Sequence, residues 1–88
     1  MLKLEIKTQL SAPEATERIK DFLAGHGLEM QQQRQGCVTF EGGGGYVHAD
    51  TWREEGRTFV DLETREWEHQ VRELANKLTE SHMMPVAR

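Results

Sequence analysis

Residues 37–64, CVTFEGGGGYVHADTWREEGRTFVDLET, decide the fold. Apolar and polar residues alternate along this stretch, and glycine-containing breaks interrupt it at residues 42–45 and at Glu55-Gly56. A period of two is typical of strands with one buried face, and such breaks are typical of hairpin loops. The stretch therefore predicts three consecutive antiparallel strands.

The register can be tested from the pattern, because a slip of one residue turns every side chain to the opposite face. We place a four-residue loop at 42–45, a two- or four-residue loop at Glu55-Gly56, and a three-residue loop at 34–36 before the stretch. All three hairpins then keep the apolar residues on one face. The predicted pairs are Gln33/Cys37, Met30/Phe40, Phe40/Val47, Thr39/His48, Val38/Ala49, Trp52/Phe59, Thr51/Val60, Ala49/Leu62, Asp50/Asp61 and His48/Glu63.

The residues before this stretch predict a strand, a helix and another strand. Apolar and charged residues alternate over 2–7, which favours a half-buried strand. Residues 11–14, Ser-Ala-Pro-Glu, form the pattern of a capping box, and Gly25 and Gly27 are expected to stop the helix that follows. A strand then begins at Leu28.

A second helix is expected from about Arg65 to Glu80, with Thr64 as its N-cap. Apolar residues at helical spacing follow, from Trp67 to Leu78. The predicted core draws on all these elements and consists of Leu4, Ile6, Ile19, Phe22, Met30, Val38, Phe40, Val60, Leu62, Trp67, Val71 and Leu74.

The element order β-α-β-β-β-β-α predicts an α+β fold, with two helices on one face of a five-stranded antiparallel sheet. This order resembles the repeat unit of TATA-box-binding-protein-like folds along nearly the whole chain, without a shared sequence motif. The resemblance implies architecture only, with the first strand beside the last and a sheet order of 1-5-4-3-2. We expect residues 1–80 to form a single domain and residues 81–88 a flexible tail.

Charge, cysteine content and apolar runs exclude some classes of function. The net charge is −4 and the pI is about 5.5, which argues against a nucleic-acid partner. Cys37 is the single cysteine, as expected of a protein in the reducing cytoplasm. Neither the alternating first residues nor any later run is apolar enough to predict a signal peptide or a membrane span.

The register also predicts the sheet face that the helices leave open. Trp52 and Phe59 pair there, either as an interface anchor or as the closing pair of a hairpin. Asp50 faces Asp61, a repulsive pair unless Lys3 and Lys7 neutralise it. The residues expected on this face are Gln31, Gln33, Cys37, Thr39, Glu41, Tyr46, His48, Asp50, Trp52, Phe59, Asp61 and Glu63.

We therefore expect a small non-enzymatic binding or assembly module without a cofactor, which uses the open face to form a homodimer or to bind a protein partner. The sequence does not separate this from a structural appendage of a larger assembly. The expected interface residues are Tyr46, His48, Asp50, Trp52, Phe59 and Asp61. The alternative is a small-ligand or metal-binding domain that uses His48, Asp50, Asp61 and Glu63, a set suited to Zn²⁺ or Mn²⁺.

Two further motifs are set aside. The glycines at 42–45 join two strands, whereas a phosphate-binding loop leads into a helix. Cys37, His48 and Asp50 have the residue types of a thiol–base–carboxylate site. The register, however, places Asp50 directly opposite Cys37, where a carboxylate raises the pKa of the thiol instead of activating it.

Overall fold

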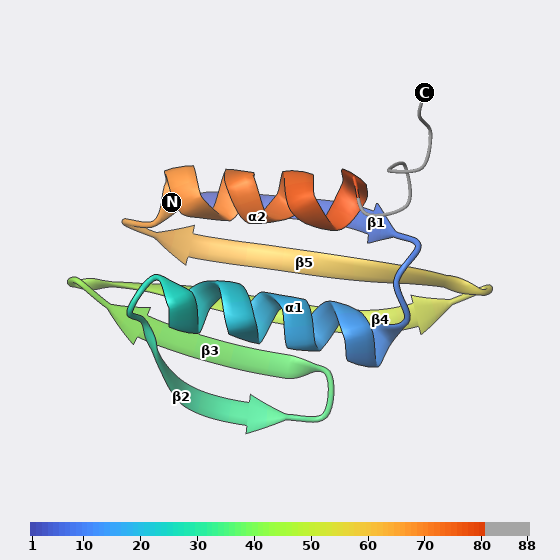
Figure 1. The fold of residues 1–88 in the computed structure, drawn as a ribbon, viewed down its shortest axis with the longest axis horizontal. Helices are drawn as coiled ribbons and strands as arrows, with labels where there is room; N and C mark the ends of the chain where they lie inside the picture. The colour runs from blue at the N-terminus through green and yellow to red at the C-terminus, as the bar shows by residue number, and fades with distance from the viewer. Residues whose placement is uncertain (81–88) are drawn as a thin grey trace.

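The computed structural model describes residues 1–80 and has an α+β fold (Figure 1). Its five strands form one antiparallel sheet in the order β1-β5-β4-β3-β2, as expected. The expected tail, 81–88, lies outside the described residues. The elements are β1 (Leu2–Thr8), α1 (Ala12–Gly25), β2 (Glu29–Arg34), β3 (Cys37–Gly42), β4 (Gly45–Glu54), β5 (Arg57–Arg65) and α2 (Glu68–Glu80).

Both helices cover the same face of the sheet, α1 over β4 and α2 over β1 and β5 (Figure 1). The start of α1 is fixed by the predicted capping box. The Ser11 hydroxyl accepts from the Glu14 backbone N–H at 3.2 Å, and the Glu14 carboxylate accepts from the Ser11 N–H at 3.1 Å. At the other end the left-handed residue is Gly27, with φ of 88°, while Gly25 remains helical. None of the helices in residues 1–80 is long and apolar enough to cross a membrane.

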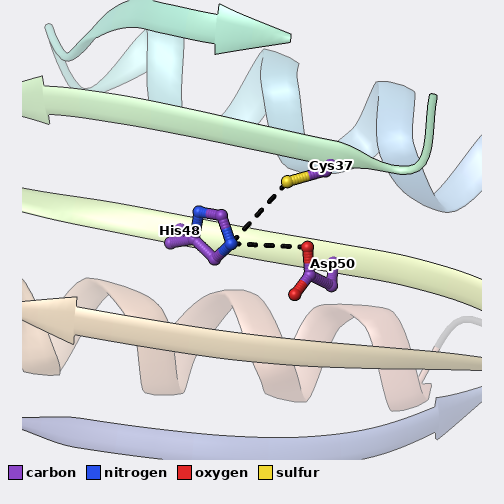
Figure 2. Close-up of side chains that lie close together, drawn as sticks. All are labelled: Cys37, His48 and Asp50. Atoms are coloured by element: carbon purple, nitrogen blue, oxygen red, sulfur yellow. Dashed lines mark hydrogen bonds and ion pairs between the residues drawn. The ribbon is translucent and has the colours of Figure 1, made fainter. Parts of the chain in front are cut away.

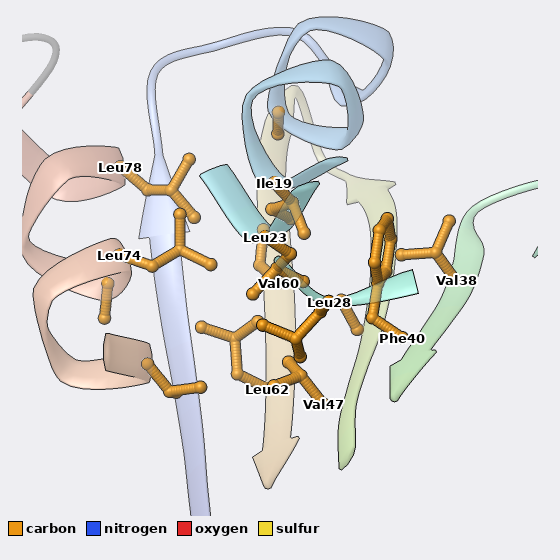
Figure 3. Close-up of a cluster of buried hydrophobic side chains, with 14 residues drawn as sticks. Ile19, Leu23, Leu28, Val38, Phe40, Val47, Val60, Leu62, Leu74 and Leu78 are labelled. Atoms are coloured by element: carbon orange, nitrogen blue, oxygen red, sulfur yellow. The ribbon is translucent and has the colours of Figure 1, made fainter. Parts of the chain in front are cut away.

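The core lies between the helices and the sheet (Figure 3). Most of the predicted core is confirmed as buried, and Leu4, Ile6, Phe22 and Trp67 are half-buried against it. The buried apolar residues are Ala15, Ile19, Leu23, Leu28, Val38, Phe40, Val47, Ala49, Val60, Leu62, Val71, Leu74, Ala75 and Leu78.

The prediction that Met30 belongs to the core is wrong, because its side chain is 42% exposed. Met30 pairs with Phe40 as predicted. It lies, however, in β2, the edge strand farthest from α2, and all six residues of β2 are exposed. The correct pairing therefore does not bury this side chain.

The loop between β2 and β3 is shorter than predicted. Arg34 pairs with Cys37, so the turn has two residues, and Gln33 pairs with Val38 instead of Cys37. A bulge between Met30 and Gln32 restores the predicted pairing beyond it. The turn is held from outside, because the Gly36 carbonyl accepts from the Thr51 N–H at 2.7 Å. The loop predicted at 42–45 is also shorter, because Gly42 pairs with Gly45 and only Gly43-Gly44 remain in the turn. The turn at Glu55-Gly56 has two residues, and the pairs predicted on either side of both turns are confirmed.

The prediction that Thr64 caps the second helix is also wrong. β5 continues to Arg65 because it pairs with strands on both sides, and Thr64 is fully buried within it. Its hydroxyl donates to the Tyr46 carbonyl at 2.6 Å. The chain turns at Glu66, with φ of 78°, before α2 begins at Glu68.

Candidate functional site

The face of the sheet opposite the helices, called the outer face below, carries the predicted site residues in rows that run across the strands. Asp50 faces Asp61, His48 faces Glu63 and Trp52 faces Phe59, as predicted. The rows are Glu5-Asp61-Asp50-Cys37-Arg34, Lys3-Glu63-His48-Thr39-Gln32 and Lys7-Phe59-Trp52.

One part of the predicted outer face is wrong. The bulge and the short turn shift β2, so that Gln32 and Arg34 stand opposite the outer-face residues Thr39 and Cys37. Gln33 pairs with Val38, whose side chain points into the core. The outer face therefore has a guanidinium beside the thiol, where an amide was expected.

Trp52 and Phe59 form a stacked aromatic pair. Their ring centroids are 5.7 Å apart and the ring planes differ by 20°. Each side chain is half-buried, and the Trp52 indole N–H donates to the Glu54 carboxylate at 3.4 Å. The pair thus covers part of its own apolar surface and leaves the rest open, which fits both a hairpin-closing pair and an interface anchor.

Tyr46 lies at the other end of β4. Its hydroxyl donates to the Glu63 carboxylate at 2.7 Å. This hydrogen bond is the main cause that raises the pKa of Tyr46, with burial and the negative charge of Glu63 as smaller causes. Glu63 is thereby held by Tyr46, although the strand register places it opposite His48.

Three side chains of different chemistry meet near the middle of the outer face (Figure 2). The Nε2 atom of His48 lies 3.3 Å from Asp50 Oδ1 and 3.7 Å from Cys37 Sγ. On the other side of the ring, Nδ1 lies 2.8 Å from the Thr39 hydroxyl. Cys37, His48 and Asp50 each offer one ligand atom, and these atoms lie within 4.8 Å of one another.

The environment of Cys37 raises the pKa of its thiol. The largest cause is the hydrogen bond to the Asp50 carboxylate; burial and the Asp50 charge also raise it, whereas the positive charge of Arg34 lowers it. The predicted effect of Asp50 on the thiol is therefore confirmed. A thiol with a raised pKa is a poor nucleophile near neutral pH.

The negative charges of Asp50 and Asp61 are not paired with the lysines of the neighbouring rows. Asp61 has Asp50 on one side and Glu5 on the other. Lys3 and Lys7 stand in the adjacent rows, opposite Glu63 and Phe59. Among the ion pairs of residues 1–80, none joins either lysine to Asp50 or Asp61. The outer face therefore has a concentrated negative charge near its centre.

The structure thus assembles part of the predicted metal-ligand set with a different third member. His48 and Asp50 come together, and Cys37 joins them, while Asp61 and Glu63 are not in this group. The predicted register already indicated that Cys37 lies near His48 and Asp50, since Cys37 faces Asp50 and Thr39 faces His48. A thiol sulfur is also a possible metal ligand, and the set predicted from the acidic and imidazole side chains did not include Cys37.

Fold and face together define a small α+β domain with one covered and one open sheet face. In comparisons with known proteins, no family model and no curated protein matches the chain.

Proposed function

We propose that this protein is a small non-enzymatic binding and assembly module, whose outer face packs against the outer face of a second copy. The observation that carries the proposal is the Trp52–Phe59 stack on the sheet face opposite α1 and α2. Large aromatic side chains, tryptophan above all, often dominate the binding energy of protein interfaces.

The mixed charges of the outer face allow a second copy to be the partner. Charges of both signs lie at each end of the outer face: Lys7, Arg57 and Glu54 at the Trp52 end, and Glu41, Glu63, Lys3 and Arg65 at the Tyr46 end. A two-fold axis through the middle of β4 places the Trp52 end of one copy against the Tyr46 end of the other. In such an isologous dimer the basic side chains of each end face acidic side chains of the other copy, which favours association, while the like charges of the two Asp50 side chains near the axis oppose it.

The proposal also assigns the protein a cellular compartment. Cys37 is a free, half-buried thiol in the structure. Free thiols persist in reducing compartments, and we place the protein in the cytoplasm on that ground.

Sedimentation equilibrium over a wide concentration series tests the association. We expect the weight-average mass to rise from that of one chain to that of two and then to level off. A mass that stays at one chain up to the highest concentration contradicts the proposed self-association. A mass that keeps rising contradicts a closed two-fold dimer.

A second candidate function rests on a hollow in the outer face of about 290 Å³. His48, Asp61 and Glu63 line it together with Lys3, so three residues of the predicted ligand-binding set share one concavity. Its acidic lining fits a small cationic ligand such as an amine. A thermal midpoint that rises with added amine, and no longer does so in Asp61→Asn, supports this function; an unchanged midpoint in the native chain contradicts it.

A further inference from the structure

We propose that Cys37, His48 and Asp50 form a zinc site on the outer face, with Cys37 Sγ, His48 Nε2 and Asp50 Oδ1 as ligands and a water molecule at the fourth position. The proposal rests on the side-chain cluster of Figure 2, which lies on the same outer face that the proposed dimer covers. All three ligands belong to one chain, on the neighbouring strands β3 and β4.

Two of the three distances between the ligand atoms are close to those of a tetrahedral site. Zinc binds sulfur at about 2.3 Å and nitrogen or oxygen at about 2.0–2.1 Å, so tetrahedral angles place ligand atoms about 3.3–3.6 Å apart. The distance from His48 Nε2 is 3.3 Å to Asp50 Oδ1 and 3.7 Å to Cys37 Sγ. These two edges of the tetrahedron therefore stand within a few tenths of an ångström of their final length before any ion is bound.

Thr39 supplies the outer contact that such histidine ligands usually have. A metal-bound imidazole donates its second N–H to a neighbouring acceptor, which fixes the ring orientation. Thr39 Oγ1 lies 2.8 Å from His48 Nδ1 and can accept that proton. A hydroxyl can also donate, so Thr39 supports either tautomer of His48, and the ring needs no rotation when Nε2 turns from hydrogen bonding to metal binding.

The ligand types favour zinc over the other common ions. A thiolate and an imidazole suit zinc, whereas calcium and magnesium prefer oxygen ligands alone. One thiolate and one carboxylate also balance the charge of the divalent ion, and the thiol proton passes to solvent when the metal–sulfur bond forms. The nearby carboxylates Asp61 and Glu5 add a negative field that attracts a cation.

In the single chain the cluster is open to solvent on one side. The side chains of His48 and Asp50 are 34% and 46% exposed, so an ion can enter and its fourth position can be filled by water. Sites with three protein ligands and one water are the open form of zinc coordination. The ligands lie on paired strands instead of a loop, which keeps their spacing fixed.

A cobalt(II) titration of the metal-free full chain, followed by displacement with zinc, tests the site. Bonding to Cys37 Sγ gives cobalt a near-ultraviolet charge-transfer band, and tetrahedral coordination gives it strong visible bands. We expect both to saturate at one ion per chain and to disappear when zinc is added. Wild-type protein without these bands overturns the proposal.

Variants then identify the ligands, with circular dichroism as the check on folding. Cys37→Ser removes the charge-transfer band, and Thr39→Val, which keeps every ligand, weakens zinc binding about 10–100-fold. Glu41→Gln is the matched control, because it removes a carboxylate from the same face but not from the cluster, and its affinity should stay within about threefold of wild type. Equal losses in Glu41→Gln and Thr39→Val overturn the site as assigned. Repeating the titration on Trp52→Ala separates metal binding from self-association, since the site needs only one chain.

Discussion

Asp50 lies directly opposite Asp61 in the β4–β5 ladder, and Glu5 lies on the other side of Asp61. Like charges at facing positions of a sheet are destabilising. Asp61→Asn should therefore raise the free energy of unfolding by about 0.2–1 kcal/mol at low salt, and by less at high salt, where the repulsion is screened. Chemical denaturation at two salt concentrations measures this. A loss of stability would show that Lys3 and Lys7 already neutralise the carboxylate, and Glu55→Gln controls for net charge alone.

The core prediction concerns Leu62, which is 1% exposed at the centre of the sheet. Leu62→Ala should lower the free energy of unfolding by about 2–5 kcal/mol, because it removes buried methyl groups and leaves a cavity. Met30→Ala, an apolar truncation on the exposed edge strand, should change it by less than about 1 kcal/mol. Denaturant titration of both variants measures the difference. Similar losses in the two would contradict the assignment of Met30 to the surface.

The thiol of Cys37 should titrate above its ordinary value of 9.0, because Asp50 hydrogen-bonds to it and opposes its ionisation. The folded protein holds the proton more firmly than the unfolded chain, so this group's contribution to stability is complete below pH 9.0 and is lost as the pH rises towards the folded-state pKa. Thiolate absorbance, followed against pH in the presence of a chelator, measures the titration. Asp50→Asn should lower the pKa, and an unchanged titration curve in that variant would contradict the assigned cause.

The hairpins from Cys37 to Arg65 were predictable because alternation and turn residues gave the same register. The face of every residue in β4 and β5 follows from that agreement, and with it the pairs Asp50/Asp61 and Trp52/Phe59. This pattern does not predict which residues of the sheet the helices bury. Met30 has the correct strand partner but lies on an edge strand whose residues are all exposed, and its burial depended on tertiary packing.

Two local errors have the same origin in tertiary contacts. Thr64 has the side chain of a good helix cap, but the pairing of β5 with two neighbours keeps it in the strand. The turn at Gln35-Gly36 is short because β4 bonds to it from outside the hairpin. The candidate site was predicted as a face, and its chemical grouping depended on side-chain directions that spacing alone does not give.

Trp52→Ala tests the central claim, that the outer face is where two copies meet. Met30→Gln is its matched control, because Met30 is the exposed apolar residue of the edge strand β2. We measure the dimer dissociation constant of both variants by sedimentation equilibrium, with folding checked by circular dichroism. The account predicts that Trp52→Ala weakens the dimer by more than about 1–2 kcal/mol, or roughly tenfold in the dissociation constant, while Met30→Gln leaves it unchanged. A Trp52→Ala protein that loses about 0.5–1.5 kcal/mol of folding stability but keeps the wild-type dissociation constant would show that the aromatic pair only closes its hairpin, and would contradict the account.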